Sequence, residues 1–149
     1  MPTSLASLAP RDAAPPRASA ADLAALLLRV AMGGLFLAHA GLKIIAFTPA
    51  GTAAFFESLG LPGAFAYLVI AAELGGGIAL ILGIHTRWVA PVLALILLGS
   101  IYTPHGAAGV FFSNPGGGWE FPAFWALVLA AQTLLGDGAY ALGRRRARI

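Results

Sequence analysis

The chain has 149 residues, of which 59% are hydrophobic and only 10% are charged, against about 45–50% and about 25% in typical soluble domains. A soluble domain of this size could not bury so much apolar surface, so we expect the excess to face lipid. The absence of cysteine excludes disulfides, thiol catalysis, Cys-ligated zinc and iron–sulfur clusters within this chain.

The net charge of +3 depends on the last residues, GRRRARI, which hold four of the nine Lys and Arg residues. A short basic tail after an apolar segment is typical of a cytoplasmic membrane anchor, or of a segment that binds anionic lipid. We therefore expect membrane lipid as a partner and no nucleic acid.

Residues 1–21 are rich in Pro, Ala and Ser without apolar periodicity, which predicts a disordered cytoplasmic tail. Four apolar runs follow, each near the ~20 residues that a bilayer's hydrocarbon core requires. They predict an all-α integral membrane protein, a four-transmembrane-helix bundle over residues 22–142. The predicted spans are about 22–46, 62–84, 88–105 and 121–142, followed by a basic cytoplasmic tail over 143–149.

The positions of the basic residues predict the orientation of these spans. With four spans, Arg11, Arg17, Arg87 and the terminal cluster fall on one side, whereas loops 47–61 and 106–120 contain no Lys or Arg. Because Lys and Arg are enriched on the cytoplasmic side, both termini are predicted to be cytoplasmic. The predicted location is the bacterial inner (plasma) membrane, with several passes.

A signal peptide is the competing interpretation of the first run. Ala38-His39-Ala40 is a small-x-small sequence after an apolar stretch, and cleavage after Ala40 would leave three spans. Arg29 in the middle of that stretch argues against a signal peptide.

Ionisable residues within or beside apolar runs are the main candidates for function, because a charge at the bilayer centre costs about 2.5–3.5 kcal/mol on insertion scales. Arg29 is predicted about 10 Å from the cytoplasmic end of its helix, near the level of Glu73. An intramembrane ion pair between the two follows, with Gln132 as an additional hydrogen-bond donor. Such a pair could act as a structural clamp, as a proton relay or as part of a ligand site.

A second group lies nearer the outside. His39 and His105 are predicted at one level, with Lys43 one turn beyond His39 and Glu120 beside Lys43. This group is the hypothetical ligand or quinone pocket: His39, Lys43, His105, Glu120. The histidines could instead be hydrogen-bonded interior groups or haem ligands, Lys43 could snorkel to the interface, and Glu120 could complement a helix dipole. No catalytic residue and no metal site is assigned.

Two further patterns concern packing. One stripe at three- and four-residue spacing is predicted to line the bundle interior: Arg29, Gly33, Phe36, Ala40 and Lys43. Small residues spaced four apart around Gly75–Gly77 and at Ala79 and Gly83 predict close helix contacts, within the bundle or in a homo-oligomer. Trp119, Trp125 and Tyr102 are expected in the outer interfacial belt, and Trp88 in the cytoplasmic one.

The ordered series of motifs resembles the DoxX family of four-helix bacterial membrane proteins. It comprises Arg29, H-A-G-L-K at 39–43, Glu73 before G-G-G, His105, G-G-W-E-F-P at 117–122 and G-D-G-A-Y at 136–140. The resemblance covers residues 22–142 and implies cytoplasmic termini and an association with respiratory or redox complexes. The family's name comes from a membrane subunit of a quinone-reducing thiosulfate oxidoreductase, and other members are linked with oxidative-stress enzymes. The chain departs from the family after Tyr140, where Ala141-Leu142-Gly143 stands in place of a common Ser-Leu-Asp and lacks both polar groups.

The resulting hypothesis is a membrane subunit of a respiratory or oxidative-stress-linked oxidoreductase with a quinone-accessible polar pocket. Electrons would come from a separate soluble or membrane oxidoreductase subunit, and no covalently bound cofactor is expected. The alternative is a non-catalytic membrane scaffold or a small-solute transporter. The sequence leaves open whether the chain is itself an enzyme.

Overall fold

The computed structural model describes residues 18–143, and all regular secondary structure in that range is helical. The helices are α1 (Ala20–Gly41), which continues into the π-helical turn η1 (Leu42–Ala46); α2 (Pro49–Ser58); α3 (Ala64–Leu82); α4 (Thr86–Ser100), which continues into the π-helical turn η2 (Ile101–His105); and α5 (Glu120–Leu135). The predicted tails at 1–21 and 143–149 lie almost wholly outside the described residues.

Three helical segments are long and apolar enough to cross a membrane, namely Ala20–Ala46, Ala64–Leu82 and Thr86–His105. The fourth predicted span is shorter than expected, because α5 ends at Leu135 and Gly136 adopts a positive φ of 75°. Its 16 residues cover about 24 Å. A crossing of the membrane by α5 therefore remains a prediction.

The predicted loop 47–61 also differs, since it contains α2. Thr48 caps this helix by accepting a hydrogen bond from the Gly51 amide, and Pro49 occupies the first helical position. Both are strong helix-start signals, which sequence analysis missed because the segment lies between two longer apolar runs.

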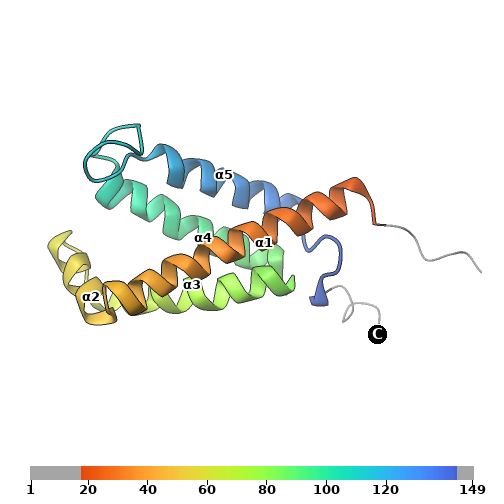
Figure 1. The fold of residues 1–149 in the computed structure, drawn as a ribbon, viewed down its shortest axis with the longest axis horizontal. Coiled ribbons are helices and arrows are strands. Elements are labelled where there is room, and N and C mark those ends of the chain that lie inside the picture. The colour runs from red at the N-terminus through yellow and green to blue at the C-terminus, as the bar shows by residue number, and fades with distance from the viewer. Residues whose placement is uncertain (1–17, 144–149) are drawn as a thin grey trace, which may run out of the picture.

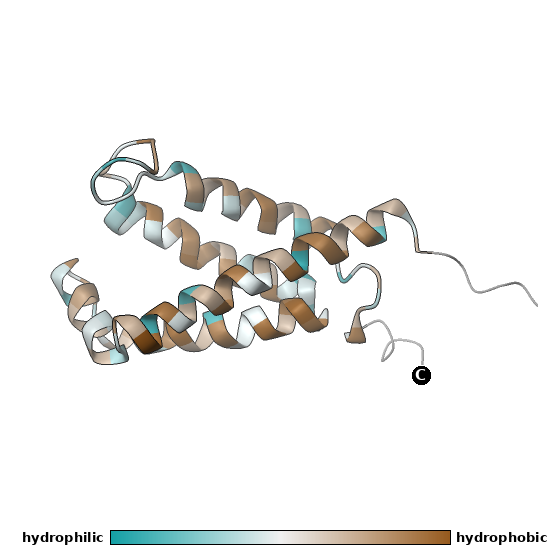
Figure 2. Ribbon diagram, viewed as in Figure 1, coloured by the Kyte–Doolittle hydropathy of each residue, from teal (hydrophilic) through white to brown (hydrophobic). Residues whose placement is uncertain are grey.

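The helices form two pairs, with α1 packed along α3 and α4 along α5, and with α3 also contacting α4 (Figure 1). The described chain begins and ends at one end of the bundle, whereas α2 and the 106–119 loop lie at the opposite end. Figure 2 shows hydrophobic residues along the whole length of the helices, with few hydrophilic ones among them. We call the two ends the terminal end and the loop end.

The predicted interior stripe of α1 is confirmed for Arg29, Gly33, Phe36 and Ala40, all of which are buried. Among the glycines on this face of α1, Gly33 makes the closest approach to α3. A Cβ at Gly33 would lie 2.7 Å from the Gly77 carbonyl oxygen, so the contact tolerates no side chain. The Gly77 spacing therefore serves packing inside the bundle.

The core is formed by Met32, Phe36, Leu80, Ala90, Leu93, Leu97, Trp125, Ala126 and Leu129. Many large apolar side chains remain on the outside; Leu127 and Leu134, for example, are 67% and 81% exposed. In a membrane protein such side chains contact lipid.

Candidate functional site

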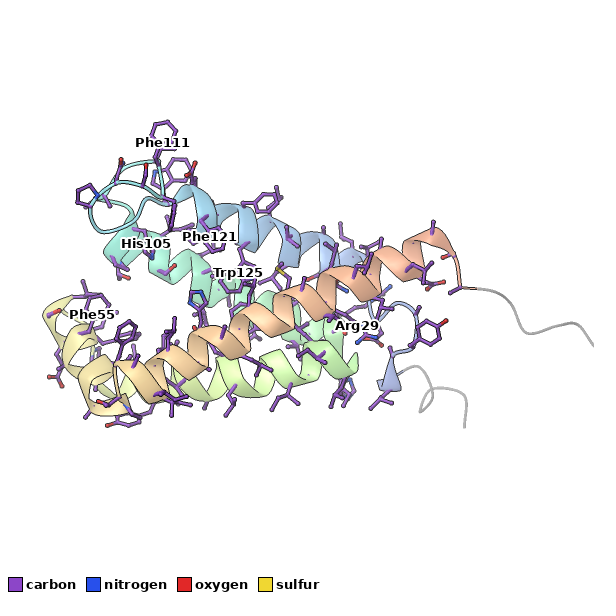
Figure 3. The ribbon with its side chains drawn as sticks, in the orientation of Figure 1. Arg29, Phe55, His105, Phe111, Phe121 and Trp125 are labelled. Carbon is purple, nitrogen blue, oxygen red and sulfur yellow. The ribbon has the colours of Figure 1, made fainter. Side chains whose placement is uncertain are left out.

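Arg29 does not pair with Glu73, which corrects the predicted ion pair. Its guanidinium donates hydrogen bonds to the carbonyl oxygens of Leu80 at 3.1 Å, Ile81, and Ala139 at 2.9 Å. Arg29 is almost fully buried, at 1% exposure. It therefore joins the end of α3 to the segment after α5 (Figure 3).

The helix geometry explains why Arg29 bonds to backbone carbonyls and not to Glu73. The last carbonyls of a helix lack partners within the helix, and a cation near them also complements the helix dipole. Gly83, with φ of 66°, ends α3 and lets the Ile84 amide bond to the Ala79 carbonyl. The Leu80 carbonyl accepts from the Gly83 amide as well as from Arg29, and Arg29 also donates to the Ile81 carbonyl. The predicted depth assumed that α1 begins at the level at which α3 ends, but α1 begins well beyond the end of α3.

Glu73 is instead paired with Lys43. The Lys43 Nζ atom lies 2.8 Å from both carboxylate oxygens, and the two side chains are 17% and 5% exposed. Lys43 and Glu73 thus form a salt bridge within residues 18–143. Lys43 thus neither snorkels freely nor meets Glu120. It lies on η1, where the Phe47 amide bonds to the Leu42 carbonyl across a widened turn, a distortion frequent at functional sites.

His105 and Glu120 hold the loop between η2 and α5. The Nδ1 atom of His105 lies 2.9 Å from the Gly117 carbonyl oxygen, and Glu120 accepts a hydrogen bond from the Phe112 amide at 2.8 Å. Figure 3 shows His105 at the loop end, close to this loop. Neither side chain bonds to His39 or Lys43 within residues 18–143. The four residues of the predicted pocket therefore do not lie together: His105 and Glu120 lie at the loop, apart from His39 and Lys43.

His39 faces α5 and not His105. Its ring lies edge-on to Trp125 with the centroids 5.1 Å apart. Phe36 and Phe121 flank the same indole at 4.5 and 5.7 Å. Trp125 is only 3% exposed, which corrects its predicted place in the interfacial belt.

The Nε1–H group of Trp125 is buried and has no acceptor among the described residues. The ring nitrogens of His39 likewise make no hydrogen bond within that part of the chain. A buried donor without a partner costs about 1–3 kcal/mol, so a ligand or water that supplies an oxygen would be stabilised here. The aromatic pattern alone did not reveal this donor, because an interfacial tryptophan has the same sequence signal.

Gln132 is also buried, but its side-chain amide donates to the Gly136 carbonyl at 2.8 Å. It reaches neither Arg29 nor Glu73 with a hydrogen bond, which corrects its predicted role. It stabilises the end of α5, one turn before the chain reverses.

The segment 136–143 closes the terminal end, a role that sequence analysis missed. Asp137 accepts from the Thr86 amide at the start of α4, at 3.0 Å. The Ala139 amide bonds to the Asp22 carbonyl at 2.9 Å, and the Gly143 amide to that of Gly83 at 3.0 Å. The G-D-G-A-Y motif at 136–140 was the available signal, because glycines with positive φ on both sides of an aspartate predict a turn.

A pocket of about 430 Å³ adjoins Lys43 at the loop end. It lies between η1 and α2 and is lined by Lys43, Phe47, Gly51, Thr52, Phe55 and Phe56. In residues 18–143 no three His, Asp or Glu side chains gather closely enough to hold a metal ion.

These features define an all-helical membrane protein whose interior carries a salt bridge and a paired histidine and tryptophan. Residues 24–106, more than half of the chain, match the DoxX family. The chain belongs to the DoxX family.

Over 82 residues the chain is 42% identical to CatD of Bacillus subtilis (strain 168), which is named a putative oxidoreductase. That match covers 55% of this chain and 60% of CatD, less than two thirds of that relative. Over 131 residues it is 34% identical to YqjF of Escherichia coli (strain K12), named an inner membrane protein, covering 83% of this chain and 92% of YqjF. No solved structure matches the chain. The chain is thus a multi-pass protein of the bacterial inner membrane.

Proposed function

We propose that the chain is the membrane subunit of an oxidoreductase and that it binds a quinone head group beside His39, Trp125 and Lys43. The observation that carries the proposal is the indole N–H of Trp125, buried next to the unpaired ring of His39. A quinone carbonyl oxygen is the kind of acceptor that such a donor lacks. Its flat ring also suits the surrounding rings of Phe36 and Phe121.

Lys43 also supports the proposal, because it lies on the same helix face as His39. It follows His39 by four residues, so the two side chains lie about one turn, or 5.4 Å, apart along the helix. That separation is of the order of a six-membered ring with two opposed carbonyl oxygens. Two of the three Lys43 N–H groups are directed to Glu73, which leaves one for a second carbonyl.

Glu73 reduces the energetic cost of placing the Lys43 charge within a membrane. Its carboxylate neutralises Lys43, and a buried ion pair in a spanning helix is by default a candidate functional site. Reduction of a quinone to a quinol takes two electrons and two protons. We assign the electrons to the redox cofactor of a separate subunit and the proton at one oxygen to His39, since imidazole is suited to proton transfer near neutral pH. The proton at the other oxygen is assigned to the Lys43 ammonium group, and water returns a proton to each of the two side chains.

The test uses the complex isolated from native membranes through a tag on this chain. Quinol formation by the copurified partner and its electron donor is measured for the unaltered chain and for His39→Ala. We expect the substitution to reduce turnover by at least tenfold without lowering the amount of chain in the membrane. His85→Asn, a histidine change at the other end of the bundle, is the matched control and should leave turnover unchanged.

Full activity of His39→Ala would contradict the proposed site. A complex that contains the chain but forms no quinol with any partner would favour the alternative of a non-catalytic scaffold. The contacts of Arg29 and of segment 136–143 fit a scaffold as well as a redox subunit, so they do not decide between the two.

A further inference from the structure

The pocket between η1 and α2 shares only Lys43 with the head-group contacts proposed above. It is lined by Lys43 and Phe47 from one side and by Gly51, Thr52, Phe55 and Phe56 of α2 from the other. Its volume of about 430 Å³ lies in the range of small-molecule sites, which is about 300–1,000 Å³. A cavity of this size beside a buried ion pair is a candidate ligand-binding site.

The pocket continues the proposed head-group site along one helix face. His39, Lys43 and Phe47 follow one another at intervals of four residues, so each lies about one turn beyond the last. A molecule whose ring contacts His39 and Lys43 would therefore extend its next atoms toward Phe47 and α2. Figure 3 shows Phe55 at this end of the bundle, opposite the end at which Arg29 lies.

The polar groups of the pocket are occupied by the protein, apart from the one Lys43 N–H group that is assigned above to the quinone head group. Lys43 is neutralised by Glu73, and the Thr52 hydroxyl donates to the Thr48 carbonyl at 2.9 Å within its own helix turn. An anionic group would find no uncompensated positive charge here. The remaining walls are aromatic, which suits hydrocarbon.

The pocket is open on its outer side. Phe47 and Phe55 are 61% and 50% exposed, and both lie on segments that adjoin the membrane-spanning helices α1 and α3. The exposed side chains at this opening are aromatic, so a hydrocarbon chain that enters here contacts apolar surface.

We infer that this pocket binds the hydrocarbon chain of a lipid-soluble quinone, with Phe47, Phe55 and Phe56 contacting the part of the chain next to the ring. The inference rests on the proposed function and adds the substrate class: a long-chain quinone taken from the bilayer, and not a water-soluble one. Gly51 lines the pocket without a side chain, and a Cβ there would meet only the Thr48 hydroxyl oxygen, at 3.3 Å.

The experiment measures quinone affinity of the full chain in lipid nanodiscs by quenching of Trp125 fluorescence. Trp88 and Trp119 are replaced by Phe in all proteins so that Trp125 is the reporter. Two probes share one ring, a quinone with a ten-carbon chain and its analogue with only a methyl group. Gly51→Leu fills the pocket, Phe55→Ala removes half-exposed ring contacts, and Gly34→Leu is the control, since a Cβ at Gly34 meets nothing within 4 Å.

With the concentration of each probe expressed per lipid, the unaltered chain should bind the long-chain quinone at least tenfold more tightly than the methyl analogue, because the hydrocarbon chain adds van der Waals contacts with Phe47, Phe55 and Phe56 to those of the ring. Gly51→Leu and Phe55→Ala should each remove most of that difference while leaving the methyl analogue unaffected, and Gly34→Leu should change neither. Equal affinity for both probes, or a chain preference that neither pocket variant reduces, would overturn the inference alone; the second result is expected if the pocket holds a phospholipid chain. Failure of either quinone to bind would overturn the proposed function and this inference together.

Discussion

At the scale of single residues, the buried polar groups show which side chains the fold itself uses. Arg29 and Gln132 bond to backbone carbonyls at the end of α3 and in the segment after α5, so they serve the structure. Trp125 has a buried donor with no acceptor within residues 18–143. Single atoms of Arg29, Thr86 and Gln132 also lack partners there, but the Trp125 donor lies beside the His39 ring, which makes no hydrogen bond within those residues either. A native protein retains such a group at a cost, and ligand binding is a frequent reason.

Replacement of Trp125 by Phe tests this distinction. The substitution keeps a ring in the core but removes a donor that bonds to nothing within residues 18–143. We expect quinone affinity to fall about tenfold, the equivalent of one hydrogen bond, while the melting temperature falls only through the smaller ring. Titration of the quinone and thermal unfolding in the same detergent measure both quantities.

Leu93→Ala is the control, since Leu93 is buried in α4 and its truncation leaves a cavity. It should lower the melting temperature more than Trp125→Phe and leave quinone affinity unchanged. Unchanged affinity of Trp125→Phe would instead remove the indole from the site.

The Lys43–Glu73 pair predicts an asymmetric effect on stability. Lys43→Met leaves the 5% exposed carboxyl group of Glu73 without a partner, and we expect a loss of about 3 kcal/mol in the free energy of unfolding. Glu73→Gln should cost less, because the Lys43 ammonium can shift toward the membrane surface. Unfolding in mixed micelles measures both, and the double variant Lys43→Met with Glu73→Met should recover stability. Equal losses in the two single variants would contradict this account.

At the scale of helices, one close contact fixes how α1 lies on α3. Gly33 and Gly77 bring their backbones together, so that the end of α3 reaches only the level of Arg29 and not the start of α1. The same offset brings Lys43 to the middle of α3, where Glu73 lies. The hydrogen bonds of Arg29 to the end of α3 and the Lys43–Glu73 salt bridge therefore both depend on the contact between Gly33 and Gly77.

Gly33→Ala should weaken this packing, because the new Cβ would lie 2.7 Å from a backbone oxygen that cannot move aside. Overpacking of this kind costs about 1–3 kcal/mol, and we expect a matching fall in thermal stability. Gly34→Ala adds the same methyl group one residue later, where nothing lies within 4 Å, and should be neutral or slightly stabilising. Similar effects of the two variants would show that the Gly33 contact is not tight in the membrane.

At the scale of the whole molecule, the arrangement of the termini and of α5 decides the topology. The described chain enters and leaves at one end, as four crossings require (Figure 1). The charge distribution predicts that this end is cytoplasmic. The structure contains no membrane, so the crossing by α5 is tested separately.

The lack of native cysteine allows a direct test with single-cysteine variants in intact cells. Ser113→Cys, on the exposed loop before α5, should react with a membrane-impermeant maleimide added from outside. Tyr140→Cys, on the exposed segment after α5, should react only after the cells are permeabilised. Labelling of both from the same side would show that α5 does not cross.

Much of the fold could be predicted from the sequence, because lipid requires long apolar helices with polar residues gathered on one face. The four apolar runs and the buried stripe from Arg29 to Ala40 follow from composition and helical spacing. The partners of the charges could not be predicted. The 1.5 Å rise fixes a residue's depth within its own helix, but not the offset between helices, which the Gly33–Gly77 contact decides. That offset places Arg29 at the end of α3 and pairs Lys43 with Glu73. The separate packing of α1 against α5 puts His39 beside the Trp125 donor, which has no acceptor within residues 18–143, so the candidate site exists only in the tertiary structure.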